Sequence, residues 1–107
     1  MVGHTGVVSA TVKAIETVDE CIGELLGVSE RENYNLIITS DHGNADNMLD
    51  EKKHPCTTHS TNLVPMIYVT KNKLELNNGC LADIAPTILD IMGIEKSKEM
   101  SGKSLIK

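Results

Sequence analysis

The sequence has no Phe or Trp and only two Tyr among its 107 residues. Aromatic side chains form the surfaces on which nucleic-acid bases stack and the cages that bind quaternary ammonium groups. The near absence of aromatic residues argues against both kinds of binding site. Hydrophobic residues make up 40% of the chain and are almost all aliphatic, so a core would be built from Ile, Leu, Val and Met.

Positive charge is also scarce. The chain has 10 Lys and Arg against 15 Asp and Glu, a net charge of -5, and Arg31 is its single arginine. Nucleic acids and anionic membrane surfaces attract basic patches, so we expect neither as a partner. Sites for phosphorylated substrates usually hold the phosphate with several arginines, so most of a phosphate clamp would have to come from elsewhere.

Three cysteines, Cys21, Cys56 and Cys80, are widely spaced and form no CxxC motif. An odd number of scattered cysteines favours reduced thiols over a disulfide framework. No apolar run is long enough to span a bilayer. We therefore expect a cytoplasmic protein that does not enter a membrane.

Helical periodicity marks two segments. Apolar residues recur at helical spacing over residues 8–26, and Gly27 with the polar residues after it predicts the end of that helix. A second helix is predicted over residues 82–92, with Gly93 as its C-terminal cap.

Two short runs rich in β-branched residues predict buried strands, at residues 36–39 and 64–69. A long polar loop, residues 43–62, lies between them, and a loop of that length usually has a function or is disordered. A helix followed by a buried strand is half of a βαβ unit, so we expect an α/β fold with a parallel sheet and helices on its faces.

Asp41 and His42 directly follow the predicted strand 36–39. Ligands of open α/β sheets bind at the carboxyl ends of the strands, and an oxygen donor beside a nitrogen donor suggests a divalent metal. His4 and His59 are the other candidate ligands. Each also has an ordinary structural interpretation, because Asp-His-Gly suits a turn and either histidine could serve in a helix entry or a loop.

The inventory is incomplete in two respects. No Ser or Thr lies in a G-x-S-x-G elbow or a similar strand-to-helix turn, so no activated nucleophile is predicted. The four candidate ligands could half-fill the shells of two metal ions, or crudely fill one, and their spacing matches no HExxH or zinc-finger motif. His54, beside Pro55, is predicted to be an ordinary surface residue. These residues predict a metal-binding half-site.

Four segments occur together in the order and with the approximate gaps of a known family. They are Met-Val-Gly-His-Thr-Gly at 1–6, Ala-Ile-Glu-Thr-Val-Asp-Glu-Cys at 14–21, Ile-Thr-Ser-Asp-His-Gly-Asn-Ala at 38–45 and Thr-His-Ser-Thr-Asn-Leu-Val-Pro at 58–65. With them the chain resembles the cofactor-independent (2,3-bisphosphoglycerate-independent) phosphoglycerate mutases. The blocks at 81–89 and 100–105 also match, although other members of the alkaline phosphatase superfamily resemble them too.

The resemblance implies that residues 1–107 are the C-terminal part of a longer enzyme and form an incomplete, alkaline-phosphatase-like metal-binding domain, a three-layer sheet with flanking helices. The family's enzymes are glycolytic isomerases that interconvert 3-phosphoglycerate and 2-phosphoglycerate through a phosphoserine. They use two divalent ions, here expected to be manganese, with magnesium or cobalt as alternatives, and require no 2,3-bisphosphoglycerate.

By position, the resemblance makes His4 and His59 ligands of one ion, and Asp41 and His42 ligands of the other. The family has a further aspartate ligand immediately before the Met of Met-Val-Gly-His, which this chain does not include. The serine nucleophile, a catalytic lysine and the substrate-binding arginines lie upstream in the family. The resemblance therefore implies no catalytic residue in this chain and no activity of the chain alone.

Two other interpretations remain. The chain could derive from a phosphopentomutase-like enzyme or another phosphatase of the same superfamily. Alternatively, it could be a non-catalytic metal-binding or assembly module that docks on a separate polypeptide. Because a truncated α/β layer leaves strand edges unpaired, we also expect the isolated chain to self-associate.

Overall fold

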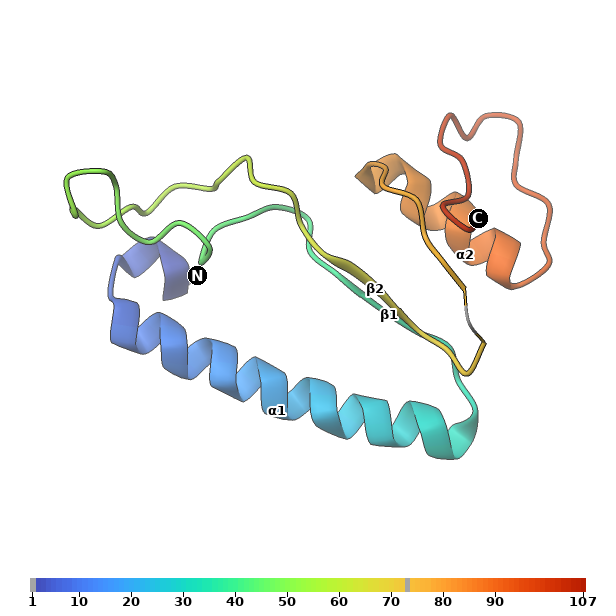
Figure 1. Cartoon of the computed structure of the whole chain (residues 1–107), viewed down its shortest axis with the longest axis horizontal. Helices are drawn as coiled ribbons and strands as arrows, with labels where there is room; N and C mark the ends of the chain where they lie inside the picture. Colours follow the sequence, from blue (N-terminus) through green and yellow to red (C-terminus); the bar gives the residue numbers. More distant parts are fainter. Residues whose placement is uncertain (1, 73) are drawn as a thin grey trace. The chain divides into compact units, whose positions relative to one another are not determined.

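The computed structural model describes residues 2–72 and 74–107. The chain divides into two compact units, Met1–Val69 and Thr70–Lys107. The first unit contains a 3-10 turn, a long helix and two strands, and the second contains a 3-10 turn and a short helix (Figure 1).

The first unit begins with η1 (Val2–Thr5), which leads into the long helix α1 (Val8–Glu32). The helix begins at the predicted residue. Gly6 lies between the two elements with φ of +69°, a left-handed conformation that glycine adopts without steric cost. A Cβ at this position would lie 2.6 Å from Cβ of Pro55, so the glycine also allows close approach of the later loop.

α1 continues past the predicted end at Gly27, and that prediction is wrong. A glycine inside a helix costs roughly 1 kcal/mol relative to alanine, which does not by itself end a helix. Beyond Gly27, the Ser29 hydroxyl donates a 2.8 Å hydrogen bond back to the Leu26 carbonyl. The helix ends at Asn33, which adopts the left-handed conformation with φ of 57° and donates its N–H to the Ser29 carbonyl. Asparagine tolerates this conformation better than most residues.

β1 (Leu36–Thr39) has the predicted bounds, and β2 (Met66–Val69) begins two residues after its predicted start. The strands pair antiparallel, with Leu36 opposite Val69 and Thr39 opposite Met66. The predicted parallel sheet is therefore wrong. Parallel neighbours need a crossover connection, usually a helix, whereas the segment 40–65 contains no helix and returns directly.

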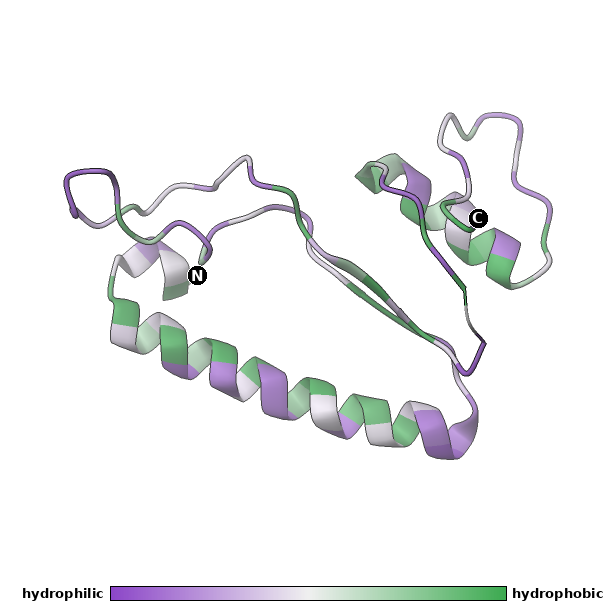
Figure 2. Ribbon diagram, in the orientation of Figure 1, coloured by the Kyte–Doolittle hydropathy of each residue, from purple (hydrophilic) through white to green (hydrophobic). Residues whose placement is uncertain are grey.

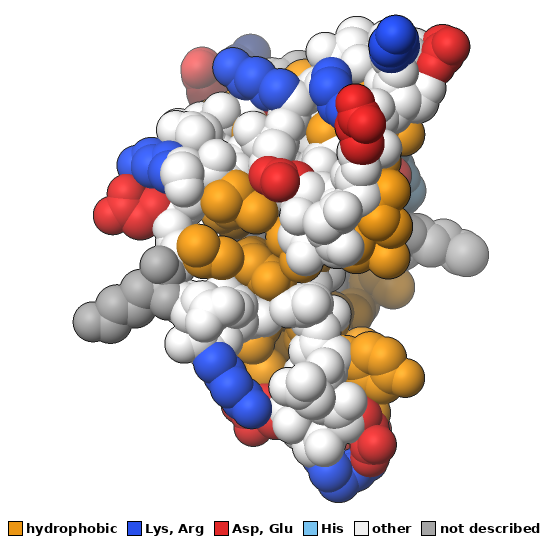
Figure 3. All heavy atoms as spheres, turned by 90° about the vertical axis from the view of Figure 1, so that its right-hand side faces the viewer, with side chains coloured by type: hydrophobic (Ala, Val, Ile, Leu, Met, Phe, Trp, Pro, Cys, Tyr) orange, Lys and Arg blue, Asp and Glu red, His pale blue; other side chains and the backbone are white. Residues whose placement is uncertain are grey.

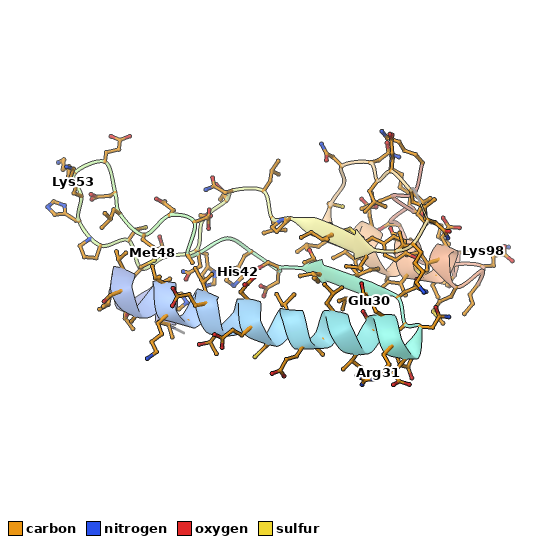
Figure 4. All side chains as sticks on the ribbon, turned by 60° about the horizontal axis from the view of Figure 1, so that its bottom comes forward. Glu30, Arg31, His42, Met48, Lys53 and Lys98 are labelled. Atoms are coloured by element: carbon orange, nitrogen blue, oxygen red, sulfur yellow. The ribbon has the colours of Figure 1, made fainter. Side chains whose placement is uncertain are left out.

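The sheet formed by the described residues has these two strands alone. α1 runs along one side of the hairpin (Figures 1 and 4). The α/β class is thus confirmed, while the expected three-layer arrangement is not. In the part of the chain that the structure covers, no helix is both long enough and apolar enough to cross a membrane.

The first unit buries little of its apolar surface. Six aliphatic residues of α1 are between 40% and 57% exposed: Val8, Val12, Ile15, Val18, Leu25 and Val28. Figure 2 shows hydrophobic residues along most of this helix up to its hydrophilic last turn, and Figure 3 shows hydrophobic side chains exposed on the face of the chain that lies at the right of Figure 1. This exposure supports the expectation of self-association, which stays a prediction.

The second unit contains η2 (Leu81–Asp83) and α2 (Ile84–Ile91), which together cover the predicted helix except its last residue, Met92. After α2, Gly93 has φ of +67°. Its N–H donates to the Asp90 carbonyl at 3.0 Å, and the N–H of Ile94 donates to the Leu89 carbonyl at 2.9 Å. These two bonds form a Schellman motif, so the predicted role of Gly93 in ending the helix is confirmed.

Asp83 and Thr87 connect α2 to the C-terminal segment. Thr87 is 0% exposed, and its hydroxyl donates to the Asp83 carbonyl at 2.6 Å and accepts the Leu105 N–H at 3.0 Å. The Asp83 carboxylate, on a residue 5% exposed, accepts the N–H groups of Cys80 and Lys103, each at 2.9 Å. Leu105, 4% exposed, is the one large aliphatic residue buried among those described.

Replacement of Thr87 should show how much this connection contributes. We expect T87V to lower the free energy of unfolding by about 1–3 kcal/mol, because the Leu105 N–H would be buried without an acceptor. T87S keeps the hydroxyl and should retain most of the stability. Urea denaturation followed by circular dichroism measures both variants. Equal stability of T87V and the wild type would contradict the expectation.

The stability should also depend on the ionisation of Asp83. Hydrogen bonds from the backbone N–H groups of Lys103 and Cys80 hold the pKa of the Asp83 carboxyl below its usual value. This contribution is complete above the unfolded-state pKa of about 3.9 and is lost as the pH falls through the lower folded-state pKa. Thermal unfolding from pH 7 to pH 2 should therefore show the wild type losing its advantage over D83N in acid. A constant difference would contradict this role.

Candidate metal site

The antiparallel hairpin brings two distant loop segments together. The carboxyl end of β1 and the amino end of β2 lie at the same end of the sheet, so residues 40–46 run beside residues 57–62. Gly43 and Ser60 form an antiparallel bridge there, and the Ser60 N–H donates to the Gly43 carbonyl at 2.9 Å. His42 and His59 each adjoin one residue of this bridge.

Three of the four predicted ligands meet at this bridge. The rings of His42 and His59 are stacked, with centroids 3.7 Å apart and planes inclined by 13°. His4, from η1, also contacts His59, with ring centroids 5.1 Å apart and planes inclined by 44°. Figure 4 shows His42 on the loop that follows β1. The ring of His59 is therefore the one shared by both contacts.

Backbone carbonyls orient two of the rings. Nδ1 of His4 lies 2.5 Å from the Thr57 carbonyl oxygen, and Nδ1 of His42 lies 3.1 Å from the Gly43 carbonyl oxygen. A carbonyl can only accept a hydrogen bond, so Nδ1 carries the proton in both residues. In the neutral rings the lone pair is then on Nε2. Metal-binding histidines commonly have this arrangement, with one nitrogen donating to the protein and the other binding the ion.

Asp41 completes the predicted set at the edge of the cluster. Its side chain is 83% exposed, and its Oδ2 lies 3.7 Å from Nε2 of His42. Two donors that bind one ion at about 2.1 Å with tetrahedral angles are roughly 3.4 Å apart. The Asp41 oxygen and the His42 nitrogen have nearly this separation, and the oxygen–nitrogen pair suits a divalent metal.

The cluster is not a closed cage. In the described residues, no three His, Cys, Asp or Glu side chains are arranged to hold a metal ion. The reason is visible in the stacking, because His42 and His59 meet through their ring faces and a metal bonds in the ring plane. The donor types fit a metal, but a shell would require these rings to turn and further ligands to be added.

Glycines permit the close approach of the segments. A Cβ on Gly3 would lie 1.6 Å from Oδ1 of Asn44, whose amide nitrogen donates to the Thr58 carbonyl at 3.2 Å. A Cβ on Gly43 would lie 2.1 Å from Oγ of Ser60. Both glycines adjoin a histidine of the cluster. A side chain at Gly3 would force the Asn44 side chain to move. One at Gly43 would force the Ser60 and Asp46 side chains to move.

Asp46 makes a second connection between the same segments. Its Oδ2 accepts hydrogen bonds from the Ser60 hydroxyl at 2.7 Å and the Asn62 amide at 2.5 Å. These two bonds hold the pKa of the Asp46 carboxyl below its usual value. The sequence interpretation missed Gly3, Gly43 and Asp46. All three lie in or next to the segments that carry the histidines, and this position in the sequence is the one signal that could have identified them.

His54 lies apart from the cluster, as predicted. It belongs to the loop between β1 and β2, in which Met48 and Lys53 are labelled in Figure 4. Its side chain is 71% exposed, and its Nδ1 lies 3.3 Å from Oδ2 of Asp50. The Asp50 carboxylate also accepts the backbone N–H groups of Lys52 and His54, at 2.9 and 2.8 Å. These bonds close the loop on itself.

Residues 1–96 match the family model described as the Metalloenzyme superfamily. The chain therefore belongs to the metalloenzyme superfamily. Over essentially its full length it is similar to 2,3-bisphosphoglycerate-independent phosphoglycerate mutases: it is 55% identical to the enzyme of Clostridium kluyveri over 100% of this chain, and 51% identical to that of Pyropia yezoensis over 99%. The Ehrlichia canis enzyme is 51% identical over 100% of the chain.

The chain spans 21% to 22% of the length of these relatives. The resemblance predicted from the motif blocks is confirmed. The placement of this sequence at the C-terminal end of such an enzyme stays a prediction, as does the ligand role of His4, Asp41, His42 and His59.

Proposed function

We propose that this chain supplies part of the metal site of a 2,3-bisphosphoglycerate-independent phosphoglycerate mutase, which interconverts 3-phosphoglycerate and 2-phosphoglycerate. One observation carries the proposal: the rings of His4, His42 and His59 meet at one end of the hairpin, beside the Asp41 carboxylate. The names of the similar enzymes support the reaction, and the superfamily supports dependence on a metal.

The proposed ligands divide into two pairs. His4 and His59 hold one ion through one pair of rings, and Asp41 and His42 hold the other through the oxygen and nitrogen that lie 3.7 Å apart. Two divalent ions, when bound, stabilise the attacking and leaving oxygens of a transferred phosphoryl group. Manganese is proposed first, with magnesium or cobalt as alternatives, because the resemblance to the phosphoglycerate mutases implies it; a mixed set of imidazole and carboxylate donors is compatible with a divalent ion.

The hydroxyls of Ser40 and Ser60, which belong to the two histidine-bearing segments, both donate to acceptors other than the rings, and this supports a nucleophile from outside the chain. The Ser40 hydroxyl donates to the His42 carbonyl at 2.8 Å, and the Ser60 hydroxyl donates to Asp46 at 2.7 Å. Neither donates to a histidine ring, which an activated serine would need as its base. We propose that the phosphoryl-carrying serine and most of the arginines that bind phosphoglycerate lie elsewhere in the enzyme, which works in the cytoplasm without 2,3-bisphosphoglycerate.

The chain alone should therefore be inactive. With purified 107-residue chain, manganese and 3-phosphoglycerate, a coupled assay for 2-phosphoglycerate should show no turnover above the protein-free rate. A purified full-length phosphoglycerate mutase of the same family serves as the positive control. Clear turnover by the chain would mean that a nucleophile has been overlooked.

Metal binding by the chain is expected to be weak and to depend on His59. Titration with Mn²⁺, followed by electron paramagnetic resonance of the free ion, should show H59A lowering the affinity by at least about tenfold. Loss of a residue that only supports a metal ligand already costs about tenfold or more, so loss of the ligand itself should cost at least as much. H54A is the matched control, because it removes a histidine of the same loop that lies outside the cluster, and its affinity should be unchanged. Equal losses in the two variants would contradict the proposed site.

A further inference from the structure

Asp46 lies where the two histidine-bearing segments are joined. Its carboxylate belongs to the segment that follows β1, and its two hydrogen-bond donors, Ser60 and Asn62, belong to the segment that precedes β2. Both bonds end on the same oxygen, Oδ2. A single charged atom thus connects backbone regions that are 14 and 16 residues apart in the sequence.

The connection adjoins the two histidines along the chain. Ser60 follows His59, Gly43 follows His42, and these two residues form the antiparallel bridge. A Cβ on Gly43 would lie 2.8 Å from Oδ1 of Asp46 as well as 2.1 Å from Oγ of Ser60. The carboxylate therefore covers the bridge at the space that the glycine leaves free. Asp46 bonds to Ser60 and Asn62 rather than to a histidine ring, so we expect it to act on the rings through the segments that carry them.

We propose that Asp46 is a positioning residue that keeps His42 and His59 in contact by joining Ser60 and Asn62 to the segment that carries His42. The inference rests on the proposed function in one respect, because the histidines matter to a metal only if they are its ligands. The contact between the rings itself does not depend on that function.

The chemistry of the acceptor makes a graded test available. D46A removes both hydrogen bonds. D46N keeps one carbonyl oxygen in nearly the same place, but hydrogen bonds to a neutral acceptor are roughly half as strong as those to a carboxylate. N62A removes one of the two donors and leaves the carboxylate in place. The expected order of disruption is D46A first, then N62A and D46N.

D50A is a matched control. It makes the same change from Asp to Ala in the same connection between the strands. The Asp50 carboxylate accepts the N–H groups of Lys52 and His54 within its own loop, away from the bridge between Gly43 and Ser60. D50A should disturb the tip of that loop and leave the contact between His42 and His59 intact.

The first measurement is made on the whole chain without metal. With histidine labelled in its ring, nuclear Overhauser effects between the ring protons of His42 and His59 report the stacking. They should be present in the wild type and in D50A, reduced in D46N and N62A, and lost in D46A. Circular dichroism of each variant checks that α1 remains helical, and the N62A result applies even if D46A does not fold.

The second measurement is the Mn²⁺ affinity of the same variants. D46A should lower it about tenfold, because the two segments that carry the proposed ligands would no longer be held together when the rings turn to bind an ion, and D50A should leave it unchanged. Ring contacts that survive in both D46A and N62A would overturn the inference, whatever the metal result. Lost ring contacts with unchanged Mn²⁺ affinity would uphold the positioning role and instead contradict the proposed metal function.

Discussion

Because β1 and β2 run antiparallel, the chain that leaves one strand meets the chain that enters the other. This pairing puts the Asp-His-Gly segment beside the Thr-His-Ser segment, and it supplies the bridge between Gly43 and Ser60 that extends the contact beyond the sheet. The cluster of imidazoles depends on it. In a parallel pair the carboxyl end of β1 would have lain beside the carboxyl end of β2, and His59 would have been at the opposite end of the strands.

Local patterns predicted the elements better than their pairing. The apolar period predicted where α1 begins, and the β-branched run predicted both ends of β1. The end of α1 was missed because a glycine at position 27 lowers helix propensity without removing a backbone hydrogen bond. The relative direction of the two strands was missed because it depends on the path of the connection, residues 40–65. That segment has no hydrophobic periodicity from which its path could be predicted. A helix followed by a strand often belongs to a βαβ unit with parallel strands, but α1 and β1 do not form such a unit here, because the partner of β1 is the antiparallel β2.

The candidate ligands were predicted by residue type and motif, whereas their arrangement was not. His4 and His59 are far apart in the sequence, and nothing in their spacing indicates that a glycine and Asn44 bring them together. The second unit depends in a similar way on groups that a hydrophobic pattern does not mark. Thr87 and Asp83 are more deeply buried than most of its aliphatic residues, because their hydrogen bonds satisfy the backbone of the C-terminal segment.

The main chain, through the carbonyls of Thr57 and Gly43, selects which nitrogen His4 and His42 present. Every amino acid at positions 57 and 43 would bring the same carbonyl group. Point mutation there cannot delete the acceptor and can alter the tautomer only by shifting the path of the backbone. Substitutions at positions 57 and 43 therefore leave the acceptor that selects the metal-binding nitrogen of each histidine in place. The carboxylate of Asp41 belongs to a side chain, so a single substitution there removes the oxygen donor of the proposed pair.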